Sequence, residues 1–176
     1  TIMEPLYVQE YTVSSIDVDC FGRMKESMLL FLAQEAAGEH SKALSVGYDE
    51  LAAKRMFWAI TRHRVQITRL PCHGETIRIE TWPMPTTKVA YPRSVVVYDQ
   101  QGQECFRAVS LWVLMDMDKR SMILPGKSGI SVVGQHSDGT GIDQGDAGGV
   151  FRGGHPFGSI FLEYLKTGNC HENLQW

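Results

Sequence analysis

The sequence predicts an α+β fold in which one long apolar helix packs against a curved antiparallel sheet. Three observations predict it: a helical period over residues 25–45, several extended runs between residues 57 and 116, and a change of composition at Pro125. The first 125 residues hold 5 of the 17 glycines, and the last 51 hold the other 12. We therefore expect one folded domain over residues 1–125 and a Gly-rich irregular tail over residues 126–176.

The long helix is the clearest element. After a strand candidate at residues 7–14 and a turn at Asp17 to Arg23, apolar side chains recur at three- and four-residue steps from residue 25 to residue 45. Gly47 is a good residue for ending this helix. A second, short helix is expected over residues 49–55. The positions that share the face of the long helix are Met24, Met28, Phe31, Leu32, Glu35, Ala36, His40, Ala43 and Leu44.

Four strands are expected next, over residues 57–67, 76–82, 88–99 and 104–116. The polar link at residues 100–103 joins the last two as a hairpin. Both of these strands are apolar on both faces, so we expect the helix to cover one face and a partner sheet or subunit to cover the other. In the tail, residues 126–158 are expected to form a loop, and only residues 160–166 can form a short helix or strand.

A long helix placed between a first strand and about four antiparallel strands is the element order of a hotdog fold. The net charge of −3 argues against a nucleic-acid partner. The cysteines are widely spaced and no histidine pair has zinc-ligand spacing, so neither a metal site nor a cofactor is expected. The longest apolar run, residues 28–33, is too short to cross a bilayer. With no signal-peptide pattern, these features favour a cytoplasmic protein.

Several segments carry a resemblance to one family. They are residues 15–24 (SIDVDCFGRM), 34–40 (QEAAGEH), 58–62 (WAITR), 67–83 and 108–120. The run from Gly74 to Pro83 (GETIRIETWP) is the most specific, followed by Ser110 to Arg120 (SLWVLMDMDKR). Together they resemble the N-terminal hotdog half of acyl-acyl carrier protein (acyl-ACP) thioesterases of the bacterial type, over about residues 7–125.

The resemblance implies a hydrolase that releases free fatty acid from acyl carrier protein. Members of the family carry two hotdog domains: the first shapes the acyl pocket, and the second carries the catalytic motif Asp-x-Asn-x-His-Val-Asn-Asn. No such motif follows Pro125 in this chain. No catalytic residue of the second domain can therefore be carried over. The tail is interpreted as a truncated or frame-disrupted second hotdog.

Two carboxylates are the candidate catalytic residues, Asp19 and Glu35. Asp17 and Asp19 stand where single-domain hotdog thioesterases often place a carboxylate that acts as base or nucleophile. The alternative is that both cap the start of the helix. Glu35 falls on the apolar helix face, and some hotdog enzymes use a mid-helix Glu as base. The alternative is a hydrogen-bonded structural Glu. His40 is expected to be an interior or rim histidine.

Flexible and aromatic side chains are candidates to line the acyl pocket, since they suit a long alkyl chain. The alternative for most of them is plain core packing. The predicted substrate-binding residues are Met28, Phe31, Leu32, Trp58 and Ile60.

Five arginines, most of them on predicted strands, form the main basic group: Arg62, Arg64, Arg69, Arg78 and Arg93. Arg62, Arg64 and Arg69 are the predicted docking residues for the acidic surface of an acyl carrier protein. The alternative is a solvated strand face with scattered salt bridges.

The predicted function is hydrolysis of fatty acyl-ACP thioesters, weakened or lost in this chain because the second catalytic motif is absent. The first alternative is a non-catalytic module that binds an acyl chain or its carrier. The second is a dehydratase acting on 3-hydroxyacyl thioesters, which needs a His–carboxylate pair across a dimer. A lone hotdog domain is expected to form a homodimer that covers its sheet edge.

Overall fold

A computed structural model describes residues 6–132 and the backbone of residues 159–164. Its elements follow in the order β1 (Tyr7–Thr12), a 3₁₀ turn (Ser15–Asp17), α1 (Glu26–Ala43), α2 (Tyr48–Ala53), β2 (Met56–Ile67), β3 (Thr76–Pro83), β4 (Tyr91–Tyr98), β5 (Glu104–Asp116), β6 (Met122–Ile123), α3 (Pro125–Ser128) and β7 (Ser159–Tyr164). Each predicted element of residues 7–116 is present, and no end differs from the predicted one by more than three residues.

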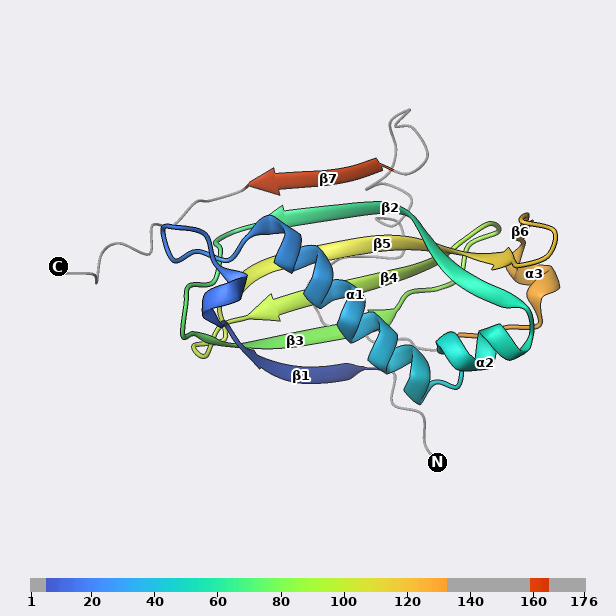
Figure 1. Cartoon of the computed structure of the whole chain (residues 1–176), viewed down its shortest axis with the longest axis horizontal. Helices are drawn as coiled ribbons and strands as arrows, with labels where there is room; N and C mark the ends of the chain where they lie inside the picture. The colour runs from blue at the N-terminus through green and yellow to red at the C-terminus, as the bar shows by residue number, and fades with distance from the viewer. Residues whose placement is uncertain (1–5, 133–158, 165–176) are drawn as a thin grey trace, which may run out of the picture.

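The strands form one sheet in the order β1-β3-β4-β5-β2-β7, and β6 pairs with β5. Neighbouring strands among β1 to β5 are antiparallel to one another. β7 runs parallel to β2, with Arg62 opposite Ser159. Figure 1 shows α1 crossing one face of this sheet, with α2 at one end. This is the helix-on-curved-sheet arrangement expected from the element order. Among the described helices, none has the length and apolarity needed to cross a bilayer.

The tail is predicted in part. Residues 125–128 form α3, a short helix that the expected loop does not include, and the strand β7 overlaps the region 160–166 that was expected to be helix or strand. Residues 133–158 and 165–176 lie outside the described residues, so the predicted irregular tail is untested there.

The main core lies between the first half of α1 and the sheet. Leu29, Leu32 and Ala36 pack there against strand residues such as Val95 and Phe106, all nearly inaccessible to solvent. A second cluster gathers Leu44, Val46, Leu51 and Tyr91 near the end of α1, with Trp58 and Trp112 packed against it.

The buried face of α1 differs from the expected one. It is formed by Leu29, Leu32, Ala33, Ala36, Ala37 and His40. Phe31 is 51% exposed and Glu35 is exposed, so placing both on the apolar face was wrong. The helix is rotated so that its small residues, which allow close approach, meet the sheet.

Gly47 does not end α1 as predicted. The helix ends at Ala43, and Ser45 takes the left-handed conformation with φ 59°. Gly47 is the residue before α2, with a φ of −72°. A Cβ at this position would lie 3.1 Å from Lys42 Cα. The glycine is thus required by the close approach of the two helices, not by its dihedral angles.

Candidate functional site

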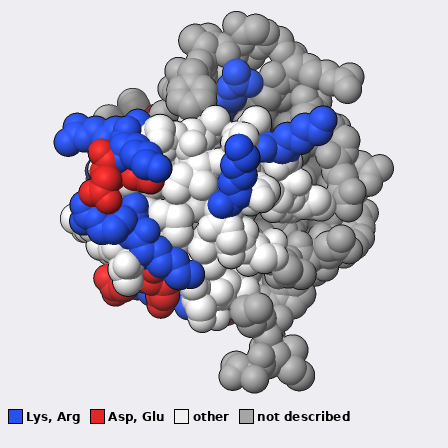
Figure 2. Space-filling model, turned by 90° about the vertical axis from the view of Figure 1, so that its right-hand side faces the viewer, with Lys and Arg blue, Asp and Glu red and all other residues white. Residues whose placement is uncertain are grey.

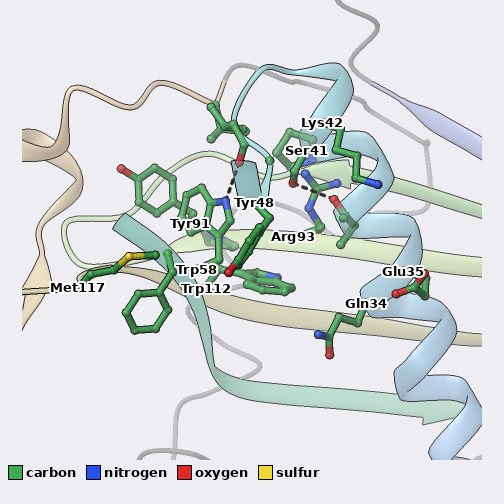
Figure 3. Close-up of a pocket in the computed structure, with 18 residues that line it drawn as sticks. Gln34, Glu35, Ser41, Lys42, Tyr48, Trp58, Tyr91, Arg93, Trp112 and Met117 are labelled. Carbon is green, nitrogen blue, oxygen red and sulfur yellow. Dashed lines mark hydrogen bonds between the residues drawn. The ribbon is translucent and has the colours of Figure 1, made fainter. Parts of the chain in front are cut away.

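A cavity of about 480 Å³ opens beside the C-terminal half of α1. This volume lies within the range of roughly 300–1,000 Å³ that is usual for small-molecule sites. Its rim is formed by exposed residues of α1 and of the turn that follows, and its interior by strands β2, β4 and β5 (Figure 3). The lining residues used below are Glu35, Lys42, Tyr48, Trp58, Tyr91, Arg93 and Trp112.

Aromatic side chains form much of the interior. Trp58 on β2 meets Tyr91 on β4 edge to face, with ring centroids 4.9 Å apart. The Trp58 indole N–H donates to the carbonyl oxygen of Val46 at 2.9 Å, which fixes the ring against the turn after α1 (Figure 3). Tyr91 is held at its other end, where its hydroxyl meets Ser128 Oγ at 2.7 Å. These contacts give the cavity a rigid, largely apolar wall.

Arg93 brings a cation into this wall. Its side chain is 5% exposed, and its Nη1 lies 3.2 Å from Thr81 Oγ1 and 3.0 Å from His40 Nδ1. An arginine can only donate, so His40 Nδ1 accepts this bond and the imidazole carries its proton on Nε2. Burial lowers the pKa of Arg93 to about 10, which still leaves it charged at neutral pH.

A line of buried polar side chains, called here the polar row, continues from Arg93 across the sheet. Arg93 lies opposite Ser110 of β5, and Ser110 lies opposite His63 of β2. Ser110 Oγ and His63 Nδ1 are 3.1 Å apart. Burial lowers the pKa of His63 to about 4, and its Nε2 has no hydrogen-bond partner. The polar row therefore consists of Thr81, Arg93, Ser110 and His63, with His40 above it from α1.

The two predicted catalytic carboxylates are not brought together. Glu35 lies on the cavity rim. Asp19 lies in the turn before α1. Glu35 lies nine residues beyond Glu26, the first residue of α1, which is roughly 14 Å along the helix axis. Asp19 accepts the backbone N–H groups of Phe21 at 2.9 Å and Arg23 at 3.0 Å, and it forms a salt bridge with Arg23. Burial acts to raise the pKa of Asp19, but these bonds outweigh it and the pKa is lowered.

Asp17 has a structural role, but it does not cap α1 as the alternative expected, because the N-cap residue of that helix is Lys25 and no side chain caps it. Asp17 is fully buried, and its Oδ2 accepts bonds from Ser14 N, Ser14 Oγ and the Tyr11 hydroxyl at 2.7–2.8 Å. The carboxylate organises the turn that leads into α1. Its pKa is lowered because these bonds outweigh the desolvation that raises it.

Of the five predicted substrate-binding residues, only Trp58 lines the cavity. Leu32 and Met28 belong to the main core. Phe31 projects to solvent, and Ile60 lies at the irregularity of β2 between Ile60 and Arg62. Sequence analysis missed Tyr91, Trp112 and the cluster of Arg93, His40 and Thr81. The only signal for the cluster was His40, whose predicted interior position is confirmed by its 2% exposure.

The predicted docking arginines lie away from the cavity. Arg62 and Arg64 are half-buried on β2, where β7 pairs. Arg69 lies past the other end of β2 and is bound by both oxygens of Glu75 and by Asp99. Figure 2 shows the end of the molecule that carries α2 and α3. Basic side chains lie there beside acidic ones, and an uncharged surface separates them from further basic side chains. The docking assignment stays a prediction.

Residues 4–124 match the family model described as the N-terminal domain of acyl-ACP thioesterase. A palmitoyl-acyl carrier protein thioesterase of Gossypium hirsutum is 25% identical over 118 residues, which cover 63% of this chain and 29% of that protein. An oleoyl-acyl carrier protein thioesterase of Arabidopsis thaliana is 24% identical over 123 residues, covering 66% of this chain and 34% of that protein. The chain thus spans about a third of the length of these relatives.

Solved structures share the fold. An acyl-ACP thioesterase from Bacteroides thetaiotaomicron superposes with a TM-score of 0.68 at 20% identity, covering 76% of this chain and 55% of that chain. The 12:0-ACP thioesterase from Umbellularia californica gives 0.64 at 21% identity, with coverages of 79% and 59%. A DHNA-CoA thioesterase from Staphylococcus aureus gives 0.64 at 11% identity, with coverages of 70% and 83%. The hotdog fold is therefore confirmed, and the match over residues 4–124 shows that the chain belongs to the acyl-ACP thioesterase family.

Proposed function

We propose that this chain supplies the acyl-binding half of an enzyme that hydrolyses fatty acyl-ACP thioesters to free fatty acids. The observation that carries the proposal is the aromatic-walled cavity beside α1 in a chain of this family. An alkyl chain placed against Trp58, Tyr91 and Trp112 would leave water, at roughly 0.8 kcal/mol for each buried CH₂ before the costs of binding.

Hydrolysis needs a water molecule that attacks the thioester carbonyl carbon and loses a proton. The C–S bond then breaks, and the sulfur of the carrier leaves as a thiolate that takes up the proton lost by the water, which gives the free thiol and the fatty acid. Glu35, exposed on the rim, is the carboxylate of the cavity lining that can accept the proton of this water. Asp19 would act only on a substrate that reaches the opposite end of α1. Cytoplasmic location, homodimerisation and docking through Arg62, Arg64 and Arg69 are further predictions of this proposal.

The alternative is a module that binds an acyl chain or its carrier without chemistry. One observation favours it: no histidine is among the described residues that line the cavity. His40 is buried and its Nδ1 is engaged by Arg93, so it cannot serve as a base toward the cavity from that nitrogen.

Release of free thiol from octanoyl- and palmitoyl-ACP separates the two. For hydrolysis through Glu35, we expect a Glu35→Ala variant to lose at least tenfold in rate, while Glu39→Ala keeps it. Glu39 is a matched control because it is exposed on the same helix and pairs with Lys42. Asp19→Ala tests the second candidate, with circular dichroism to confirm folding. Saturable binding of octanoyl-ACP without thiol release would establish the module. Absence of both turnover and binding would refute the proposal.

A further inference from the structure

Arg93 is a buried cation, and its two hydrogen-bond partners among the described residues are both neutral. Its Nη1 donates to a threonine hydroxyl and to the unprotonated nitrogen of His40. Within residues 6–132, no carboxylate forms a salt bridge with it, and burial is the one cause of its lowered pKa. A charged group removed from water is strongly disfavoured unless a counter-charge compensates it.

The guanidinium is placed where a ligand could provide that counter-charge. Arg93 lines the cavity, and only Nη1 takes part in its recorded bonds to described residues. The edge formed by Nε and Nη2 carries two parallel N–H groups, which match the two oxygens of a carboxylate. Thr81 and His40 both bind Nη1, on the other side of the guanidinium, so they fix the orientation of the Nε–Nη2 edge.

The aromatic part of the cavity wall determines what kind of group can accompany the anionic end of the ligand. Trp58, Tyr91 and Trp112 offer apolar surface beside Arg93 (Figure 3). Lys42 is the other cation of the lining, but it is exposed on the rim and already paired with Glu39. A group with an aliphatic body and one anionic end would match both parts of the cavity.

We propose that the cavity binds an aliphatic carboxylate, with the carboxylate on the Nε–Nη2 edge of Arg93 and the chain against the aromatic wall. This inference rests on the proposed function and deepens it. The same chemistry has two sources: a free fatty acid, which is the product of thioester hydrolysis, or an acyl group that carries a second carboxylate at its far end while still bound as a thioester.

The test compares the binding of octanoate and of 1-octanol to the full chain at pH 7 by intrinsic tryptophan fluorescence, since two of the four tryptophans, Trp58 and Trp112, line the cavity. We expect octanoate to bind at least tenfold more tightly. Arg93→Gln should remove this preference, whereas Lys42→Gln should retain it. The comparison on the unmodified chain decides the matter even where Arg93→Gln fails to fold. Equal affinity for the two ligands would overturn the inference and leave an acyl cavity in place. A preference that Lys42→Gln abolishes would also overturn it.

A second pair of ligands identifies the source. The octanoyl thioester of N-acetylcysteamine is compared with the corresponding monothioester of octanedioic acid. Tighter binding of the octanedioic compound, lost in Arg93→Gln, assigns the site to ω-carboxyacyl groups. Equal binding of the two thioesters, with tight binding of octanoate, assigns it to the free fatty acid. If neither octanoate nor octanol binds, both the carboxylate site and the assignment of this cavity to acyl chains are refuted, whatever the rate of thiol release.

Discussion

The burial of His63 predicts that the fold loses stability over a definable range of acidic pH. The imidazole is 4% exposed, and desolvation lowers its pKa from 6.5 to about 4 in the folded chain. The unfolded chain therefore binds a proton at a higher pH than the folded chain does. The stabilisation is fully present above pH 6.5 and is lost as the pH falls toward 4.

The size of the effect follows from the difference in pKa. The difference between a pKa of 6.5 and one of about 4 corresponds to roughly 3 kcal/mol, at about 1.4 kcal/mol for each tenfold change in proton affinity. About 2 kcal/mol of the free energy of unfolding should be lost between pH 7 and pH 5, and nearly all of the 3 kcal/mol by pH 4. The pKa values of Asp17, Asp19 and Asp99 are lowered, so these carboxylates lose their stabilising bonds mainly below about pH 4.

Urea denaturation of His63→Gln and of the unmodified chain at pH 7, 6, 5 and 4 measures this contribution. The variant should show a pH-dependent loss smaller by about 3 kcal/mol, whatever its stability at pH 7. His73→Gln is the matched control because His73 is exposed, and it should follow the unmodified chain. The same pH dependence in His63→Gln and in the unmodified chain would show that His63 is accessible to protons in the folded state.

Three further outcomes are expected. Leu32→Ala should lower the free energy of unfolding by about 2–5 kcal/mol, whereas Phe31→Ala should change it by less than about 0.5 kcal/mol. A larger loss of stability in Phe31→Ala would show that Phe31 is on the buried face of α1, as predicted from the sequence. Asp17→Ala should lower the free energy of unfolding, measured by urea denaturation, by about 2–4 kcal/mol because it leaves the donors of Ser14 and Tyr11 unpaired. Asp49 is exposed, so Asp49→Ala should leave this free energy nearly unchanged. Iodoacetamide at pH 8, followed by peptide mass spectrometry, should label exposed Cys20 and spare Cys105, whose pKa burial raises to about 12; equal labelling would contradict the burial.

The order and type of the elements could be predicted because their periods are local properties of the sequence. The ends could not always be predicted, and the third expected strand shows why. Residues 88–90 continue the extended pattern, yet Thr87 Oγ1 accepts the backbone N–H of Ala90 at 2.9 Å and holds them in a turn. This bond from side chain to backbone competes with the sheet and leaves no trace in the apolar pattern.

The face of α1 and the interior of the cavity could not be predicted for a different reason. In the sequence, nothing distinguishes Arg93 from the other charged residues on predicted strands. It is buried because the register brings Ser110 opposite it and because α1 places His40, 53 residues away, within 3.0 Å. Such long-range pairings cannot be read from a local period. Trp58 is predicted from the sequence because a flat aromatic ring suits an alkyl chain, and the structure places it in the cavity wall.

The polar row also explains why the predicted pocket and the observed cavity differ. The row crosses the sheet from Thr81 to His63 beneath α1, and Leu29 and Leu32 of the main core are nearly inaccessible to solvent. The cavity lies toward the C-terminal half of the helix, where Trp58 and Tyr91 replace aliphatic packing. The buried guanidinium of Arg93 is therefore part of the wall of this cavity, whereas Met28 packs against the main core. An oxygen anion beside that cation offsets its desolvation, which is why the proposed ligand carries a carboxylate. The chemistry of this part of the wall thus depends on Arg93, which the pairing of β4 with β5 and the position of α1 hold in place.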